Sequence, residues 1–255
     1  MTNAQPRGPL TGRTALVTGA ASGIGAAVAR RMAADGATVL AVDLDGAGVK
    51  ALARDVAGVE PVVCDLSDLA AVDALPGEVD VLVNNAGVQH VAPVHEFDPE
   101  RFSTILKIML EAPFRLSRRV LPHMYEQGWG RIINISSVHG VRASAFKSAY
   151  VTAKHGLEGL SKVIALEGAP HGVTSNCVNP AYVRTPLVEK QIADQARQHG
   201  IGEDEVVEKI MLTPVAVKRL VEPDEVAELA AVLYGPASAS LTGTSLPLDG
   251  GWTAH

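Results

Sequence analysis

Short runs of apolar residues recur along the chain and alternate with longer amphipathic stretches. The runs are rich in Val, Ile and Leu and show little alternation of apolar and polar positions, which is typical of strands covered on both faces of a parallel sheet. They predict seven strands, at Thr14–Thr18, Thr38–Asp43, Pro61–Asp65, Asp80–Asn84, Arg131–Ser136, Thr174–Asn179 and Ser245–Asp249.

Helical periodicity fills the intervals between these runs. Because a proline has no backbone N–H, Pro113 should kink or interrupt the third predicted helix, in which it lies. The order of elements predicts an α/β fold: one Rossmann-type, doubly wound parallel sheet of about seven strands with helices on both faces. The predicted helices are Ile24–Ala34, Gly46–Ala57, Pro99–Met124, Lys147–Ala169 and Pro223–Tyr234.

The segment Thr185–Thr213 has a different composition. It carries Pro186, Gly200 and Gly202 among charged helix formers, and it follows the sixth strand. That position lies at the carboxyl edge of the sheet, where ligands bind in this architecture. We expect a small helical lid over the active site, with an ordinary surface insertion as the alternative.

Composition narrows the class of protein. The chain has 255 residues, 47% hydrophobic and 20% charged, which suits one large domain spanning residues 1–255. A net charge of −6 without a long basic run argues against a nucleic-acid partner. Residues 1–11 lack an apolar signal core and no stretch has the length of a membrane span, so we expect a cytoplasmic protein without a membrane partner.

Cysteine and histidine spacing gives no metal site. Cys64 and Cys177 lie in separate apolar runs and are expected to be buried free thiols. His90, His95 and the other histidines do not form a ligand set, so no catalytic metal is expected.

A glycine-rich loop follows the first strand and opens the first helix. Its glycines allow the backbone to close on a pyrophosphate at the helix N-terminus. Asp43, at the end of the second strand, suits the two ribose hydroxyls of an adenosine and would repel a 2′-phosphate, so the expected cofactor is NAD and not NADP. A turn or cap residue is the alternative reading of Asp43. The loop residues are Thr18, Gly19, Ser22, Gly23, Ile24 and Gly25.

Tyr150 and Lys154 stand four residues apart, with Ser137 thirteen residues before the tyrosine. On a helix this spacing puts both side chains on one face. A nearby ammonium favours the phenolate, so Lys154 should lower the pKa of Tyr150 and let it exchange a proton with an alcohol or carbonyl. Ser137 lies at the end of a strand, from where its hydroxyl group could reach the oxygen of the same alcohol or carbonyl. The same pair also occurs by chance on solvated helices.

These motifs together resemble the short-chain dehydrogenase/reductase family over essentially the whole chain. The resemblance rests on the glycine loop, Asn84-Asn85-Ala86-Gly87, Ser137 and Tyr150-x3-Lys154. It implies Tyr150 as general acid/base, Ser137 as the donor that positions the substrate oxygen, and Lys154 as the group that tunes Tyr150 and holds the nicotinamide ribose. It also implies cofactor contacts from Asp65, Leu66, Asn85, Ala86, Gly87, Tyr150, Lys154, Pro180, Val183 and Thr185.

The chain departs from the family pattern at two places. Met109 stands where the family usually carries an asparagine that feeds a proton relay, and a thioether is a poor partner for water. Ala181 follows Pro180 where glycine is usual, which reduces backbone freedom. A relay through position 109 is therefore not expected.

Three segments narrow the resemblance to the D-3-hydroxybutyrate dehydrogenases within that family: Gly87–Val91, Ser137–Tyr150 and Val183–Ile192. The resemblance implies interconversion of (R)-3-hydroxybutyrate and acetoacetate. A small 3-oxo acid needs donors for its carboxylate, and four side chains near Tyr150 offer them. Tyr182 stands where that pattern has a tryptophan. The expected substrate residues are Gln89, Ser137, His139, Lys147, Tyr150, Tyr182 and Gln191.

Other readings remain open. A dehydrogenase of another secondary alcohol would explain Met109 and Tyr182, although a bulky neutral substrate would leave Lys147 without a purpose. An NAD-binding scaffold or sensor without turnover is the alternative from another class. The resemblance implies a homotetramer, and Trp252 is apolar enough to be covered by a partner subunit or by its own domain.

Overall fold

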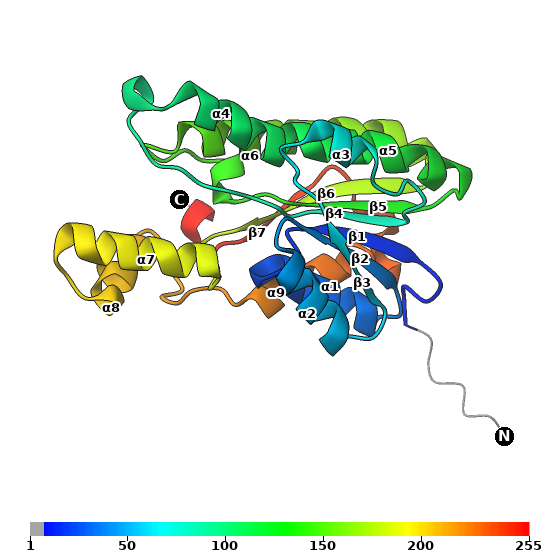
Figure 1. Cartoon of the computed structure of the whole chain (residues 1–255), viewed down its shortest axis with the longest axis horizontal. Helices are drawn as coiled ribbons and strands as arrows, with labels where there is room; N and C mark the ends of the chain where they lie inside the picture. The colour runs from blue at the N-terminus through cyan, green and yellow to red at the C-terminus, as the bar shows by residue number, and fades with distance from the viewer. Residues whose placement is uncertain (1–7, 255) are drawn as a thin grey trace.

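The structure is a computed structural model that describes residues 8–254, apart from the side chains at positions 194, 198 and 199. Residues 1–7 and 255 of the expected single domain lie outside the described residues. Seven parallel strands form one sheet in the order β3-β2-β1-β4-β5-β6-β7 (Figure 1). The strands are β1 Thr14–Thr18, β2 Thr38–Asp43, β3 Val59–Val63, β4 Val81–Asn84, β5 Gly130–Ile135, β6 Val173–Pro180 and β7 Ser245–Leu248.

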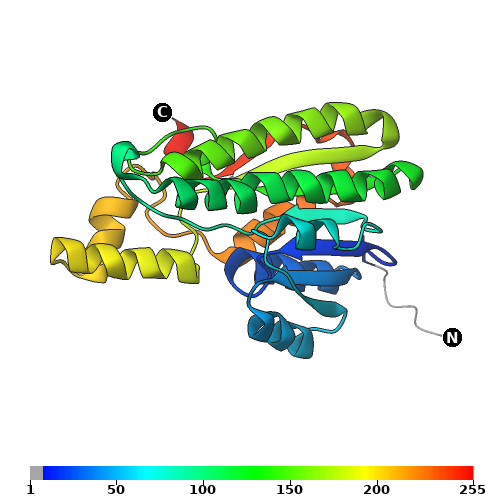
Figure 2. The same cartoon turned by 45° about the horizontal axis from the view of Figure 1, so that its top comes forward.

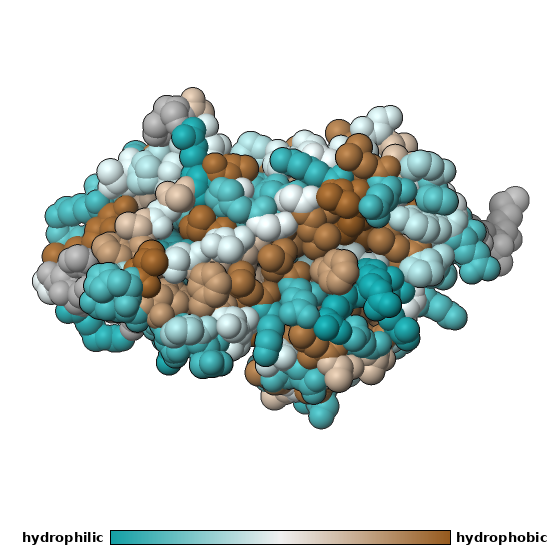
Figure 3. All heavy atoms as spheres, turned by 90° about the horizontal axis from the view of Figure 1, so that it is seen from above, coloured by the Kyte–Doolittle hydropathy of each residue, from teal (hydrophilic) through white to brown (hydrophobic). Residues whose placement is uncertain are grey.

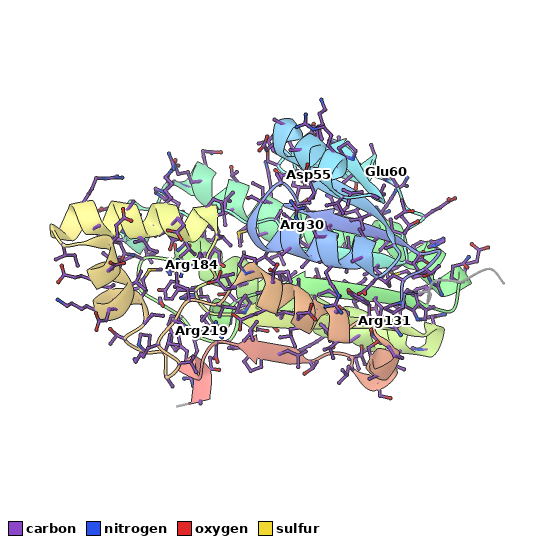
Figure 4. The ribbon with its side chains drawn as sticks, turned by 90° about the horizontal axis from the view of Figure 1, so that it is seen from below. Arg30, Asp55, Glu60, Arg131, Arg184 and Arg219 are labelled. Carbon is purple, nitrogen blue, oxygen red and sulfur yellow. The ribbon has the colours of Figure 1, made fainter. Side chains whose placement is uncertain are left out.

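Helices cover both faces of the sheet, as Figures 1 and 2 show. One face carries α1 (Gly23–Ala34), α2 (Gly46–Asp55) and α9 (Pro223–Val232), and the other carries α3 (Leu69–Asp73), α4 (Pro99–Leu106), α5 (Ala112–Glu126) and α6 (Ser148–Gly168). Figure 4, seen from below, shows the first of these layers in front of the strands. The predicted doubly wound α/β fold is confirmed.

Successive strand residues enter opposite cores, which explains the unbroken apolar runs. In β1, Leu16 packs in the cluster that contains α5 and α6 residues, and Val17 packs in the cluster of α1 and α9. Ile132 and Ile133 of β5 divide in the same way. Because side chains alternate across a strand, a sheet buried on both faces needs apolar residues at every position.

The strand order reverses between β1 and β4. In an open parallel sheet the loops on the two sides of such a switch point diverge, and a crevice opens at the carboxyl ends of the strands. The ends of β1, β4, β5 and β6 therefore face this crevice. It is the expected ligand position.

The helix predicted over Pro99–Met124 is three segments. Between α4 and α5 the backbone forms a π-helical turn, Lys107–Glu111, in which Ala112 N–H donates to the carbonyl of Lys107 five residues back. Pro113, the second residue of α5, has no N–H for the carbonyl of Met109, so the regular ladder is interrupted at this point. The predicted break is present, and its form is a π turn.

Two other element predictions need correction. β3 runs over Val59–Val63, two residues before the predicted range, and α3 was not predicted. β3 is an edge strand whose burial is only partial, so its apolar pattern is weak. α3 has five residues, too few to show helical periodicity.

The segment predicted as a lid forms a small helical layer of its own. It consists of α7 (Pro186–His199), α8 (Glu203–Val206) and a π-helical turn, Val207–Met211. Its apolar side chains make a separate cluster that includes Val188, Ile192, Val206 and Met211. In Figure 1 this layer projects beyond the carboxyl edge of the sheet.

Ion pairs connect the base of this layer to the helix that follows it. Arg184 contacts Glu222 and Glu189, and Arg219 forms a two-pronged pair with Glu225 in the first turn of α9. Figure 4 shows both arginines beside the start of α9. The α7–α8 layer is therefore connected to the core at its base.

Candidate active site

A pocket of about 430 Å³ lies in the crevice at the carboxyl ends of the strands. It takes residues from the glycine loop, from the ends of β2, β4, β5 and β6, and from the start of α7. Of the predicted cofactor residues, all but Thr18 and Gly25 line it. These are Gly19, Ser22, Gly23, Ile24, Asp43, Asp65, Leu66, Asn85, Ala86, Gly87, Tyr150, Lys154, Pro180, Val183 and Thr185.

The glycine loop is folded tightly and braced from behind. Gly19 and Gly23 adopt positive φ angles of 67° and 53°, which side chains disfavour. A Cβ at Gly25 would lie 2.0 Å from the carbonyl oxygen of Gly19. Asn85 Nδ2 donates to the carbonyls of Thr18 and Gly19, and Thr18 Oγ1 accepts from Asn85 N. Thr18 thus fixes the loop from its buried side.

The N-terminus of α1 opens into this pocket without an acidic residue in its first turn. Free N–H groups at a helix start attract phosphate, and an acidic side chain there would oppose this attraction. The loop and helix therefore fit the pyrophosphate of a dinucleotide.

Asp43 is held in a defined orientation at the far end of the pocket. Its Oδ2 accepts from Ala21 N and its Oδ1 from Asp45 N, each at 3.0 Å. Leu44, the next residue, is exposed and apolar. Asp65 accepts two hydrogen bonds from Ser67, which lower the pKa of its carboxyl group. A fixed carboxylate beside a pyrophosphate loop fits a ribose diol.

Ser137, Tyr150 and Lys154 meet at the inner end of the pocket. Tyr150 lies in the first turn of α6, Lys154 one turn later, and Ser137 just after β5. Lys154 Nζ donates to the carbonyl of Ile135 at 2.6 Å and lies 5.7 Å from the centre of the Tyr150 ring. The expected juxtaposition of the three side chains is present.

The predicted lowering of the Tyr150 pKa is not found. Burial raises the pKa of Tyr150, a hydrogen bond with Ser137 opposes this shift, and Lys154 is not among the groups that change it. Burial also lowers the pKa of Lys154 to about 8, against the attraction of Cys177 and Glu158. The reason is desolvation, which disfavours the charged form of either group.

A buried carboxylate behind the three residues was missed from the sequence. Glu158 lies one turn after Lys154 on α6 and is 5% exposed. Its Oε1 accepts from Asn179 Nδ2 at 2.6 Å, and the same Nδ2 donates to the carbonyl of Ser137 at 2.9 Å. Ser245 Oγ donates to Oε2 at 2.5 Å. The only local signal for Glu158 was its position eight residues after Tyr150 on the same predicted helix.

The predicted substrate residues lie on the other side of Tyr150. Apart from Ser137 and Tyr150 they do not line the 430 Å³ pocket. Gln191 Nε2, on α7, donates to Gln89 Oε1 at 2.8 Å, and Gln89 Nε2 is buried without a partner. This contact joins α7 to the loop after β4.

Lys147 occupies the turn that leads into α6. The preceding residue, Phe146, has a φ of 68°, a left-handed conformation that is unusual for a bulky side chain. Lys147 Nζ lies 5.7 Å above the ring of Tyr182, and burial lowers its pKa. Among the described residues no carboxylate lies within ion-pair distance of Lys147. Its charge is thus available to a ligand.

Aromatic rings connect these side chains to Tyr150. Tyr182 stacks on Trp252 with ring centres 5.6 Å apart, and Trp252 meets His139 edge-on at 5.7 Å. His139 in turn meets the Tyr150 ring at 5.9 Å. Trp252 therefore packs on its own chain. Tyr182 also borders a second pocket of about 200 Å³, with Leu212, Val215, Val217 and Asp249 among its other residues.

His139 is 4% exposed, and each of its ring nitrogens has a serine partner. Nδ1 lies 3.4 Å from Ser137 Oγ, and Nε2 lies 2.8 Å from Ser144 Oγ. Burial, with the nearby charges of Lys147 and His155, lowers the pKa of His139 to about 4. The imidazole is neutral at pH 7.

Met109 is buried in a cluster with Ile105, Ala149 and Ala153. Its terminal methyl carbon would lie 3.7 Å from a Cβ at Gly87, so it packs beside the cofactor loop. Within the described residues, no group of three or more His, Cys, Asp and Glu is arranged to hold a metal ion. None of the described helices is long and apolar enough to cross a membrane.

Comparison with known proteins agrees with this geometry. Residues 13–196 match the family model for short chain dehydrogenases. The chain is 44% identical to "D-beta-hydroxybutyrate dehydrogenase" of Rhizobium meliloti over 95% of this chain and 99% of that one. The protein of the same name from Cupriavidus necator is 42% identical over 96% and 100%.

A solved structure of a variant actinorhodin polyketide ketoreductase with NADPH superposes with a TM-score of 0.89. It is 33% identical and covers 95% of this chain and 98% of that one. The family model and the two relatives thus agree with the fold, the glycine loop and the Ser-Tyr-Lys arrangement. The chain belongs to the short-chain dehydrogenase family of oxidoreductases.

Proposed function

We propose that the protein is an NAD-dependent dehydrogenase that interconverts (R)-3-hydroxybutyrate and acetoacetate. The observation that carries the proposal is the unpaired charge of Lys147, half-buried beside the aromatic rings that lead to Tyr150. A partly buried ammonium without a carboxylate partner costs free energy that a ligand anion would offset. The names of the two relatives support the same substrate.

The carboxylate of the substrate would be bound by Lys147 with the two glutamines of the lid contact. Gln89 Nε2 is a buried donor without a partner, and such a donor costs about 1–3 kcal/mol unless an acceptor reaches it. Gln191 brings a second amide from α7. A small hydroxy acid would thus be held at one end while its hydroxyl group faces Ser137 and Tyr150.

A nicotinamide cofactor, when bound, supplies the hydride acceptor, and the glycine loop, Asp43 and Lys154 would hold it. Tyr150 takes the alcohol proton during oxidation and returns it during reduction. Ser137 donates a hydrogen bond to the reacting oxygen and keeps it beside Tyr150. Lys154, fixed to the carbonyl of Ile135, stabilises negative charge on the Tyr150 oxygen when the phenol is deprotonated.

NAD is proposed over NADP because of Asp43. Both carboxylate oxygens are fixed by backbone donors, so the carboxylate cannot turn away from a 2′-phosphate without breaking two hydrogen bonds. The exposed Leu44 offers no compensating cation. Repulsion between the Asp43 carboxylate and a neighbouring 2′-phosphate costs several kcal/mol of binding free energy when solvent is excluded. This lowers the affinity for NADP on the order of a hundredfold or more.

A steady-state assay tests the proposal. NADH formation is measured with (R)- and (S)-3-hydroxybutyrate and with a panel of neutral secondary alcohols, and NADPH formation is measured in parallel. We expect turnover of the (R)-acid with NAD. A preference for NADP would refute the cofactor, and a preference for neutral alcohols would refute the substrate. Tight NAD binding without turnover of any compound would indicate a scaffold.

A dehydrogenase of a larger secondary alcohol or 3-oxo compound is the second candidate. It is favoured by Tyr182, whose hydroxyl adds a polar group to the wall and which borders the adjoining 200 Å³ pocket. A substrate that extends past Tyr182 would use this space. The alcohol panel should therefore include longer 3-hydroxy acids.

A further inference from the structure

Glu158 is a buried carboxylate that the proposed chemistry does not use. It lies on α6, one turn after Lys154, and is 5% exposed. Charged side chains are almost never this buried unless they are paired. The two carboxylate oxygens of Glu158 instead accept from neutral groups, Oε1 from Asn179 and Oε2 from Ser245. These bonds join α6 to the strands β6 and β7.

Asn179 uses both hydrogens of its amide. It is 2% exposed and lies near the end of β6. Nδ2 donates to Glu158 Oε1 at 2.6 Å and to the backbone carbonyl of Ser137 at 2.9 Å. Because an amide carries two hydrogens on nitrogen and none on oxygen, turning it over would place Oδ1 against two acceptors. Glu158 therefore fixes the orientation in which Asn179 bonds to Ser137.

The carboxylate of Glu158 is itself held in one orientation. Ser245 Oγ donates to Oε2 at 2.5 Å, while Asn179 holds Oε1. A nitrogen-to-oxygen distance of 2.6 Å is short, as expected where the acceptor is ionised, and such bonds are stronger than those between neutral groups. An ionised carboxylate thus supports Asn179 more firmly than a neutral acceptor would.

The turn that carries Ser137 packs on the same carboxylate. Ser137 has an extended backbone, with φ −170° and ψ 166°, and leads into the 3-10 turn Val138–Gly140. Its carbonyl also accepts from Gly140 N at 2.8 Å. A Cβ at Gly140 would lie 2.8 Å from Glu158 Oε1, so the backbone of the turn lies directly against the carboxylate. The peptide of Ser137 is therefore held by its own turn and by Asn179.

We propose that Glu158 is a positioning residue for Ser137 and acts through Asn179. The bond from Asn179 fixes the Ser137 peptide, and with it the direction of the Cα–Cβ bond that carries the hydroxyl group. A donor that stabilises the reacting oxygen must be held in the productive geometry by such supporting hydrogen bonds. The role of Ser137 at that oxygen belongs to the proposed function, on which this inference rests.

Substitution of Asn179 isolates this role. Asn179→Ala removes both hydrogen bonds but keeps the Glu158 carboxylate near Lys154, so an effect through the charge of Lys154 is avoided. We expect kcat to fall about tenfold or more. Asn179→Ser, whose single hydroxyl hydrogen can serve only one acceptor, should lose less. Thr174→Val, at a buried hydroxyl group without a partner on the same strand, is the control. An unchanged kcat in Asn179→Ala would refute the proposal.

A double-mutant cycle tests whether Asn179 acts through Ser137. In a Ser137→Ala background, Asn179→Ala should lower kcat little further, because the hydroxyl group that it positions is already absent. The KM for the hydroxy acid should rise in both backgrounds, since the same turn carries His139, one of the predicted substrate residues. An equal loss of kcat in both backgrounds would overturn the proposal, because it would indicate a general loss of structure. Asn179→Ser replaces Asn179→Ala in the cycle if the latter does not fold.

The amide of Asn179 gives a measurement that is independent of the substrate. In protein labelled with 15N-asparagine and assigned with Asn179→Ala, its two side-chain hydrogens should exchange slowly with solvent, and faster in Glu158→Gln. Fast exchange in the parent protein would refute the support from Glu158. If the protein turns over a different alcohol, the proposed substrate fails, while the cycle measured with that alcohol still decides this inference.

Discussion

Tyr150 is a phenol in a site that raises its pKa, although the proposed reaction needs it to lose a proton. Burial accounts for this shift, and a hydrogen bond with Ser137 opposes it. Lys154, the expected activator, has its ammonium directed to the carbonyl of Ile135. At the residue scale, neutral Tyr150 is therefore stabilised in the free protein. Because an ammonium that stabilises the phenolate lowers the pKa of Tyr150, the proposed mechanism requires Lys154 to act more strongly on Tyr150 with ligands bound than in the free protein.

Replacing Tyr150 with Phe removes the proton acceptor and leaves the ring contact with His139. We expect kcat to fall by about a thousandfold or more, because general acid/base catalysis contributes on the order of 10²–10⁴. NAD affinity, measured by calorimetry, should change little. Tyr125→Phe, at a tyrosine that stacks on His171 away from the site, is the matched control. Substantial turnover in Tyr150→Phe would contradict the role given to it.

Glu158 affects the charge of Lys154 from within the core. Burial lowers the Lys154 pKa to about 8, and the charges of Cys177 and Glu158 oppose this lowering. Lys154 is cationic below this pKa and neutral above it. Glu158→Gln removes the attraction, so the Lys154 pKa falls and its cation is lost at a lower pH. We expect the alkaline decline of kcat to move to lower pH.

The measurement is kcat against pH from 6 to 10 for both proteins. Glu167→Gln, an exposed glutamate on the same helix, should leave the profile unchanged. An alkaline limb at the same position in Glu158→Gln would show that Glu158 does not influence Lys154. Because Asn179 joins Glu158 to the carbonyl of Ser137, a lower kcat at all pH values is expected as well.

At the element scale, α7 is joined to the loop after β4 by the contact between Gln191 and Gln89. Gln191→Leu keeps the size of the side chain but removes its donors. We expect KM for the hydroxy acid to rise about tenfold, since one hydrogen bond to a charged group contributes roughly 1.5–3 kcal/mol. Affinity for NAD, and stability to urea, should stay close to those of the parent protein.

Lys190→Gln, one residue earlier on α7 and exposed, is the control for Gln191→Leu. A KM that is unchanged in Gln191→Leu would remove α7 from substrate binding. The segment would then be a surface insertion, the alternative reading of its composition.

The sequence predicts elements well where burial is uniform and poorly where it is not. The inner strands are buried at nearly all positions and mostly apolar, so their ranges agree with the structure within one residue at each end. β3 lies at the sheet edge and includes Glu60 and Pro61, which an edge strand tolerates. Pro113 predicted an interruption, but the π form depends on how α4 and α5 pack and has no local signature.

The site residues that the sequence predicts belong to short motifs, and those that it misses depend on contacts between distant segments. The glycine loop, Asp43 and the Tyr150–Lys154 pair are motifs of short sequence range, and all reach the same pocket. The hydrogen bonds of Glu158, Asn179 and Ser245 join residues 21 to 87 positions apart, so no local pattern reveals them. The pKa of Tyr150 was predicted wrongly for the same reason, because burial is a tertiary property.

At the scale of the whole molecule, apolar side chains remain on the outer face of the α4–α6 layer. Phe114 is 49% exposed, Val163 51% and Leu166 79%. Figure 3, seen from above, shows apolar residues gathered among polar ones on this side. Large apolar side chains that are this exposed and lie on one face often mark contacts between subunits. We therefore propose that these helices take part in the homotetramer that the family resemblance implies.

Sedimentation equilibrium measures this directly. We expect the parent protein to sediment as a tetramer, and Leu166→Glu to shift the population to dimers or monomers because a charge would be buried at the contact. Lys50→Glu, at an exposed lysine of α2 on the opposite face of the sheet, is the control for the change in charge. A monomeric parent protein would contradict the proposed assembly.

The position of the first turn of α7 has a consequence for the order in which ligands bind. Thr185, Pro186, Leu187 and Val188 line the dinucleotide pocket, whereas Gln191, on the same helix, contacts the substrate side at Gln89. A dinucleotide bound against this first turn would fix the start of α7. The rest of the helix could then close over a second ligand. We therefore expect compulsory-order kinetics, with NADH competing against NAD but not against the hydroxy acid in product-inhibition experiments. Random-order patterns would mean that the two halves of the helix act independently.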